Sequence, residues 1–307
     1  MIVGLALLVQ SAKIFVSASV DIARRLKIPR LIIGLTIVAM GTSAPEVVVS
    51  VSAAIKGSGD LAVANVLGSN LFNLLFIVGF CAMLYPISVK MRAISRDYWV
   101  SLAATILLFL MIVVFDNAIP RLASLVLLVG FAVYMFVVVR HALKNRVDEE
   151  NNGEKPPKPL GISIFLAILG TALIVAGGQL TVSSAVDIAA SLGISERVVG
   201  LTIVAMGTSL PEIVTTLMAC RKKEGEFAIG FIIGSSIFNI MFVLGLAGVI
   251  TPLAIAPGVV FDIAVLTVGT LAFFLFAKSS KRVVRLEGLV MVLGFLGYMA
   301  VVLWAQN

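Results

Sequence analysis

The chain has 307 residues, of which 60% are hydrophobic and only 13% are charged, and its mean hydropathy is +1.14. Soluble domains are about half apolar and about one quarter charged, so this composition excludes an ordinary water-soluble globular protein and predicts a membrane protein. The net charge of +7 does not indicate nucleic-acid binding, because the basic residues stand in short clusters between apolar segments.

Ten apolar segments follow one another along the chain, and each is long enough for a helix that crosses a bilayer, which takes about 20 residues. Continuous apolar stretches favour helices over a β-barrel, whose strands would alternate between apolar and polar residues. We therefore predict an all-α polytopic membrane protein with ten transmembrane helices. They cover residues 2–24, 30–55, 60–84, 97–115, 119–142, 161–190, 196–220, 226–250, 257–277 and 283–304.

A polar segment at residues 144–160 separates the fifth predicted helix from the sixth. It is charged, rich in proline and has no apolar face, so we predict a solvated linker. This linker divides the chain into a first five-helix repeat at residues 1–143 and a second five-helix repeat at residues 161–307.

The basic residues lie almost entirely on one side of the predicted membrane. Nineteen of the 23 follow the odd-numbered helices, whereas only Lys56, Arg121 and Arg197 lie on the opposite side and Lys13 lies within the first helix. Cytoplasmic loops carry an excess of lysine and arginine. We therefore expect a multi-pass protein of the cell (plasma or inner) membrane, with a cytoplasmic linker and both termini extracytoplasmic.

The two halves are similar in sequence. A shift of 166 residues aligns 4–86 with 170–252 without a gap, and GLTIVAMGTS occurs at 34–43 and again at 200–209. Because each half has an odd number of helices, the second half should enter the membrane from the opposite side. This pattern predicts inverted-topology repeats, which secondary transporters arrange around an ion site near the middle of the membrane.

Each half carries a proline followed by a glutamate within an apolar helix, in GTSAPE at 41–46 and GTSLPE at 207–212. Proline lacks an N–H group and clashes with the preceding turn, so both helices should be broken there. Glu46 and Glu212 are then carboxylates inside the bilayer, where ionisable residues are costly and usually functional. The alternative is a paired glutamate that braces a kink, but Lys13 is the only lysine or arginine away from the ends of another predicted helix that could be its partner.

Small polar residues recur on the third and eighth predicted helices. Ser69 and Asn73 are four residues apart and share one helix face, as do Ser235 and Asn239. Such a face alone is more typical of helix packing, but beside two glutamates it favours a binding site. Carboxylate, hydroxyl, amide and carbonyl oxygens suit Ca²⁺ and also Na⁺, whereas zinc or copper would favour histidine or thiol clusters.

In these paired motifs the chain resembles the cation/calcium exchanger superfamily, with GTSAPE and GSNLFN in one half and GTSLPE and GSSIFN in the other. The resemblance covers nearly the whole chain and implies two gating helices, the first and sixth, that slide across a core of the other eight. It also implies a set of cation ligands from both halves. These are Glu46 and Glu212 for both ions, backbone oxygens of Thr42 and Thr208 for Ca²⁺, Ser43, Ser69, Ser209, Ser235 and the carbonyl of Ala205 for Na⁺, and Asn73 and Asn239 at the centre.

We therefore expect a secondary active antiporter that exchanges Ca²⁺ for Na⁺ by alternating access. No cofactor, enzymatic activity, nucleic-acid partner or obligate protein partner is expected. The proton-coupled branch of the superfamily has asparagine where this chain has Thr42 and Thr208, which favours sodium. The alternatives are exchange of Ca²⁺ for H⁺, antiport of Mn²⁺ or Mg²⁺, and a cation channel. Asp262 and Glu287 have no evident counterpart in the other half, and we interpret both as structural.

Overall fold

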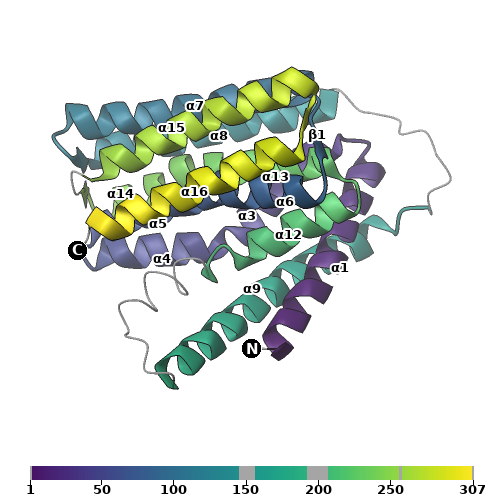
Figure 1. Cartoon of the computed structure of the whole chain (residues 1–307). Coiled ribbons are helices and arrows are strands. Elements are labelled where there is room, and N and C mark those ends of the chain that lie inside the picture. Colours follow the sequence, from purple (N-terminus) through teal and green to yellow (C-terminus); the bar gives the residue numbers. More distant parts are fainter. Residues whose placement is uncertain (1, 145–155, 192–206, 256–257, 306–307) are drawn as a thin grey trace. The chain divides into compact units, whose positions relative to one another are not determined.

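The computed structural model describes residues 2–144, 156–191, 207–255 and 258–305 (Figure 1). The chain forms two compact units. The first comprises Met1–Pro45 and Met135–Phe231, and the second comprises Glu46–Tyr134 and Ile232–Asn307. Each unit therefore contains segments from both halves of the sequence.

The first unit is built from helices. Its elements are α1 (Ile2–Leu26), α2 (Arg30–Ile33), the π-helix η1 (Gly34–Val38), α3 (Ala39–Thr42), α9 (Leu160–Ser191), α12 (Leu210–Arg221) and one end each of α8 (Arg121–Lys144) and α13 (Gly225–Ile237).

Helices α1 and α9 lie side by side in this unit (Figure 1). Glycines permit the close approach, because a Cβ on Gly177 would lie 2.9 Å from the backbone nitrogen of Leu8 and a Cβ on Gly170 would lie 2.9 Å from the Cβ of Phe15. Small residues at helix interfaces let membrane helices pack closely. The spacing of α1 and α9 therefore depends on these glycines.

Two basic side chains form long-range hydrogen bonds near the ends of helices in the first unit. The Arg25 guanidinium at the end of α1 donates a hydrogen bond to the Lys158 carbonyl, with an N–O distance of 2.9 Å. The Lys222 ammonium after α12 donates to the Lys13 carbonyl at 3.2 Å and to the Ser17 hydroxyl of α1. Burial lowers the pKa of Lys222 from its ordinary value. Both side chains therefore connect α1 to segments that are distant from it in the sequence.

The second unit is also mainly helical. Its elements are α4 (Ala44–Ile55) from Glu46 onward, α5 (Gly59–Leu71), the π-helix η2 (Phe72–Ile77), α6 (Val78–Leu84), α7 (Met91–Val114), α8 up to Tyr134, α13 from Ile232, the π-helix η4 (Phe238–Val243), α14 (Leu244–Ile250), α15 (Val259–Ser280) and α16 (Arg285–Ala305).

Two short antiparallel strand pairs connect loops of the second unit. β1 (Ile87–Ser88) pairs with β4 (Arg282–Val283), and β2 (Ala118–Ile119) pairs with β3 (Leu253–Ala254). Each pair joins a loop of the first sequence half to a loop of the second. These strands are not predictable from the sequence, because two residues are too few for a recognisable alternation.

The described residues contain eight helices that are long and apolar enough to cross a membrane, or nine when the bent pair Leu31–Thr42 and Ala44–Ile55 is counted as one span. The all-helical polytopic architecture is confirmed. Two parts of the prediction lie outside the described residues. They are residues 192–206, which include the first part of the predicted seventh helix, and residues 145–155 of the predicted linker. Ten helices, the inverted repeats and the division at 144–160 stay predictions.

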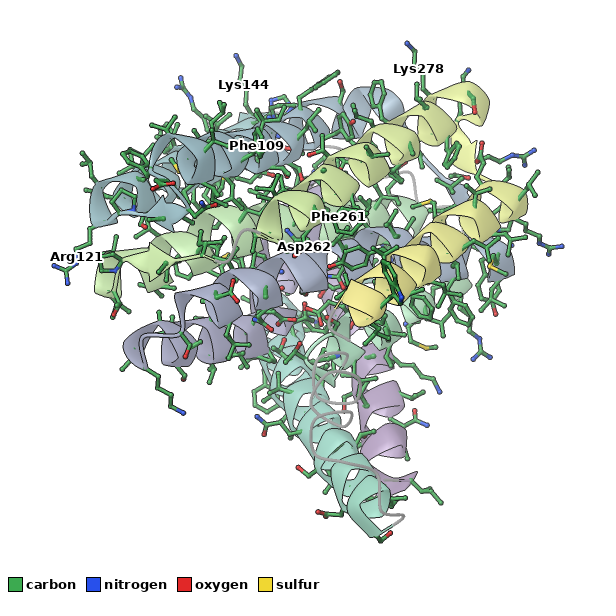
Figure 2. All side chains as sticks on the ribbon, turned by 60° about the vertical axis from the view of Figure 1, so that its left-hand side comes forward. Phe109, Arg121, Lys144, Phe261, Asp262 and Lys278 are labelled. Atoms are coloured by element: carbon green, nitrogen blue, oxygen red, sulfur yellow. The ribbon has the colours of Figure 1, made fainter. Side chains whose placement is uncertain are left out.

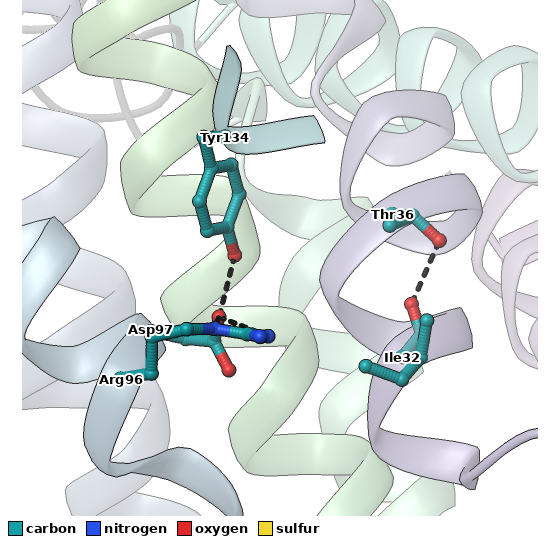
Figure 3. Close-up of polar contacts among 5 residues, drawn as sticks. All are labelled: Ile32, Thr36, Arg96, Asp97 and Tyr134. Carbon is teal, nitrogen blue, oxygen red and sulfur yellow. Dashed lines mark hydrogen bonds and ion pairs between the residues drawn. The ribbon is translucent and has the colours of Figure 1, made fainter. Parts of the chain in front are cut away.

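Two aspartate–tyrosine pairs show that Asp262 has a counterpart, contrary to the sequence-based expectation, and they agree with a structural role for it. Asp262 lies on α15 (Figure 2), and its Oδ1 atom accepts a hydrogen bond from Tyr298 at 2.9 Å. Tyr134 donates to the Oδ1 atom of Asp97 on α7 at 3.2 Å (Figure 3). Asp262 therefore has a counterpart in Asp97, which we had not singled out. The structural interpretation of Glu287 is confirmed, because its carboxylate accepts the backbone N–H of Val284 at 2.8 Å at the start of α16.

The two pairs should contribute unequally to stability. Asp97 is fully buried and also contacts the Arg96 guanidinium at 3.1 Å, whereas Asp262 is half-buried. We expect Tyr134→Phe to lower the free energy of unfolding by about 1–3 kcal/mol, because it removes a hydrogen bond from a buried carboxylate. Tyr298→Phe should cost less. Thermal unfolding of both purified variants in detergent measures this, and equal losses would contradict the ranking.

Candidate cation-binding site

Both Gly-Thr-Ser motifs end in a backbone break. Ser43, after α3, has φ −81° and ψ 12°, and Ser209, before α12, has φ −91° and ψ 5°. This bridge region of backbone space is sparsely populated and is where many active-site residues lie. The next helix begins one residue later in each case, with Pro45 or Pro211 as its second residue. The break predicted from Pro45 is confirmed by a bend of 49° between Leu31–Thr42 and Ala44–Ile55. The segment before Gly207 lies outside the described residues, so the break of the second helix stays a prediction.

The two glutamates occupy matching positions, in the first turn of the helix that follows each break. Glu46 lies in the first turn of α4 and Glu212 in the first turn of α12, and both side chains are fully buried. The partial positive charge at a helix N-terminus stabilises a carboxylate there. Each break therefore presents a buried acidic group that the backbone itself helps to hold.

Serine hydroxyls contact both carboxylates. In the first unit, the Ser43 hydroxyl donates to the Oε1 atom of Glu212 with an O–O distance of 3.3 Å, which joins the two motifs directly. In the second unit, the Ser69 hydroxyl of α5 donates to the Oε1 atom of Glu46 at 3.2 Å. Four of the predicted site residues are thus brought together in two pairs.

The predicted ligands are divided between the units. The first unit holds Thr42, Ser43, Thr208, Ser209 and Glu212, and the second holds Glu46, Ser69, Ser235, Asn73 and Asn239. All of these are buried except Thr208, which is half-buried. Ala205 lies outside the described residues. The Thr42 hydroxyl donates to the Val38 carbonyl at 3.1 Å in its own helix.

The two asparagines lie in π-helical segments that the sequence analysis did not predict. Asn73 belongs to η2 and Asn239 belongs to η4, and both side chains are fully buried. π-Helical segments are rare and occur frequently at functional sites. The repetition of FNLLFI as FNIMFV was the only available signal, and no periodicity distinguishes such a segment from an ordinary helix.

The amide groups of these asparagines are poorly satisfied within the protein. Among the described residues, neither amide atom of Asn73 has a hydrogen-bond partner, and the Oδ1 atom of Asn239 has none. A buried polar atom without a partner costs about 1–3 kcal/mol. A buried amide oxygen without a hydrogen-bond partner is suited to bind a cation, which supplies the missing interaction.

Two further asparagines on α5 support the site, and sequence reasoning gave them no role. The Asn65 amide nitrogen donates to the Ser50 hydroxyl of α4 at 2.9 Å, and the Asn70 Oδ1 atom accepts the amide of Asn239 at 3.1 Å. Asn70 belongs to the GSNLFN motif, so its place beside Ser69 was the signal that could have identified it.

An open groove borders the first break within the first unit. It has a volume of about 590 Å³ and is lined by Gly41 and Ala44 together with Thr171, Gln179 and apolar residues of α9. A Cβ on Gly41 would lie 3.1 Å from the methyl group of Thr171, so the glycine keeps α9 close to the break. The broken segment is therefore accessible along one side of α9.

Comparisons with known proteins agree over the whole length of the chain. A family profile described as sodium/calcium exchanger protein matches residues 1–140 and 162–304. The chain is 40% identical to the proposed antiporter CaxA of Alkalimonas amylolytica, over 97% of this chain and 95% of that protein. It is 30% identical to the sodium/calcium exchanger MaX1 of Methanosarcina acetivorans, over 99% and 97%. The solved structure of the sodium–calcium exchanger NCX_Mj soaked with Na⁺ superposes with a TM-score of 0.85 at 30% identity, over 97% of this chain and 96% of that one.

Proposed function

The chain belongs to the sodium/calcium exchanger family, and on that premise we propose that it is a secondary active antiporter that exchanges Ca²⁺ for Na⁺ by alternating access. The observation that carries the proposal is the pair of backbone breaks at Ser43 and Ser209. Each break is followed by a buried glutamate in the first turn of a new helix, and each glutamate accepts a serine hydroxyl.

Glu46 and Glu212 act as ligands of both transported ions in this proposal. Two carboxylates compensate the charge of one Ca²⁺, or part of the charge of several Na⁺, so the two ions compete for the same oxygens. Competition for shared ligands is the simplest basis for coupled exchange. The other ligands are the backbone oxygens of Thr42 and Thr208, the hydroxyls of Ser43, Ser69, Ser209 and Ser235, the carbonyl of Ala205, and the amides of Asn73 and Asn239.

The proposed membrane topology has ten helices in two inverted five-helix repeats. The concentration of basic residues after the odd-numbered helices supports a cytoplasmic linker at 144–160 and extracytoplasmic termini in the cell membrane. Helices α1 and α9 are the proposed gating pair. Their glycine-mediated packing supports movement as one element, and the groove beside Gly41 lies along α9 next to the first break.

Counter-ion-resolved flux in liposomes tests the function. The purified protein is reconstituted into liposomes loaded with Na⁺, and uptake of radioactive Ca²⁺ is measured against external buffers without Na⁺. We expect uptake that requires the outward Na⁺ gradient and that stops when internal Na⁺ is replaced by K⁺. Empty liposomes and liposomes with equal Na⁺ on both sides are the controls.

Each alternative gives a different result in the same assay. Ca²⁺ uptake driven by a pH gradient in Na⁺-free buffer would replace Na⁺ by H⁺ as the coupling ion. Uptake that persists with no counter-ion would indicate a channel. Na⁺-dependent uptake of Mn²⁺ or Mg²⁺ with no uptake of Ca²⁺ would change the transported ion and leave the antiport mechanism in place.

A further inference from the structure

Asn70 makes two long-range hydrogen bonds from the end of α5. It is fully buried within the second unit. Its Nδ2 atom donates to the backbone carbonyl of Ser236 in α13 at 3.3 Å. Its Oδ1 atom accepts a hydrogen bond from the Nδ2 atom of Asn239 in η4 at 3.1 Å. The side chain therefore bridges the helix of one sequence half to the π-helix of the other.

The two hydrogen bonds fix the orientation of the Asn70 and Asn239 amide groups. A backbone carbonyl accepts hydrogen bonds and cannot donate them, so Asn70 must turn its NH₂ group toward Ser236. Its carbonyl oxygen then faces Asn239, and Asn239 must in turn present its own NH₂ group to that oxygen. The other polar atom of the Asn239 amide is Oδ1, and it has no hydrogen-bond partner among the described residues.

From this geometry we infer that Asn70 is a positioning residue, which fixes the amide of Asn239 so that its oxygen and not its NH₂ group is presented to the transported cation. The inference rests on the proposed function, in which Asn239 is a ligand. A flipped amide would direct N–H dipoles at a cation and repel it. Residues behind the ligands of a metal site orient those ligands in the same way and are needed for full affinity.

In the described part of the chain, Asn73 has no equivalent hydrogen-bond bridge. Ser236 stands 166 residues after Asn70, at the equivalent position, and its hydroxyl donates to the Ile232 carbonyl of its own helix at 3.0 Å. No described side chain holds the amide of Asn73, since neither of its polar atoms has a hydrogen-bond partner in the described part of the chain. The two central asparagines therefore differ: the amide of Asn239 is held by a hydrogen bond from a described side chain, and the amide of Asn73 is not.

The test compares Ca²⁺ binding by four variants of the full-length protein: Asn70→Leu, Asn239→Ala, the double variant and Asn70→Asp. Binding is measured by titration of the purified protein with Ca²⁺ in Na⁺-free detergent buffer. We expect Asn70→Leu to weaken Ca²⁺ binding about tenfold or more. The double variant should bind as weakly as Asn239→Ala alone, because Asn70 acts only through that amide. Asn70→Asp keeps an oxygen that accepts from Asn239 and should bind more tightly than Asn70→Leu.

Thr105→Val is the matched control. Thr105 and Asn70 line the same cavity of about 20 Å³, which has room for one water molecule, and the Thr105 hydroxyl donates to the Ser101 carbonyl of its own helix at 3.0 Å. The substitution removes a buried polar group near Asn70 without touching Asn239, so Ca²⁺ binding should be unchanged. If Asn70→Leu fails to fold, Asn70→Ser removes the same bridge with the residue found at position 236.

The outcomes separate this inference from the proposed function. Wild-type protein that neither binds nor transports Ca²⁺ would overturn the proposed function and the inference with it. Wild-type transport together with unchanged Ca²⁺ binding in Asn70→Leu would overturn the inference alone. Additive losses in the double variant, or no loss in Asn239→Ala, would likewise show that Asn70 does not act by orienting Asn239.

Discussion

Glu46→Gln is expected to abolish Na⁺-dependent Ca²⁺ flux, and Glu212→Gln is expected to do the same. Glutamine has the size of glutamate and still offers an oxygen to the Ser69 or Ser43 hydroxyl. The change therefore removes the negative charge and little else. Removing one partner from a buried charge pair costs about 3–5 kcal/mol, which corresponds to roughly a hundredfold or greater loss of cation affinity. Flux in reconstituted liposomes measures the effect.

Glu226→Gln is the matched control for these two variants. Glu226 also lies in the first turn of a helix, at the start of α13, but it is half-buried and belongs to neither motif. Its flux should equal that of the wild type. Size-exclusion profiles and thermal unfolding verify that all three variants are folded. Flux retained by both Glu46→Gln and Glu212→Gln would contradict the proposed ligands.

Much of the architecture follows from local properties of the sequence. Hydropathy located the described helices to within a few residues, because a membrane helix must be apolar over about 20 residues whatever its neighbours are. The breaks at Ser43 and Ser209 followed from Pro45 and Pro211, since the effect of proline on a helix is also local. The composition of the paired motifs then indicated the exchanger family before any contact was known.

The features that were missed depend on contacts between distant residues. The π-helices η2 and η4 have the same apolar composition as their surroundings, so no local pattern indicates them. The bond between Asp97 and Tyr134 joins residues 37 positions apart, and the bridge from Asn70 to Asn239 spans 169 positions. A single sequence contains no signal for such pairs beyond the motif in which Asn70 stands.

The second large effect is expected at the contact of α6 with α16. A Cβ on Gly288 would lie 2.5 Å from the carbonyl oxygen of Gly79, and a Cβ on Gly79 would lie 2.7 Å from the carbonyl oxygen of Gly288. Both obstacles are backbone atoms and cannot turn aside. We expect Gly288→Ala to lower the free energy of unfolding by about 3 kcal/mol, the upper end of the range for overpacking. Thermal unfolding in detergent measures the loss.

Gly294→Ala on the same helix separates crowding from the loss of glycine itself. Apart from its chain neighbours and the adjoining backbone of its own helix, no atom of the described residues lies within 4 Å of the position that its Cβ would occupy. Alanine also has a higher helix propensity than glycine, by about 1 kcal/mol, so this variant should be unchanged or more stable, opposite in sign to Gly288→Ala.

The effect of Gly288→Ala should also reach the site, because α6 continues directly from η2, which holds Asn73. Forcing α6 away from α16 should therefore reduce Ca²⁺ flux even in the folded fraction, and normal flux per folded molecule would show that the two glycines serve stability alone.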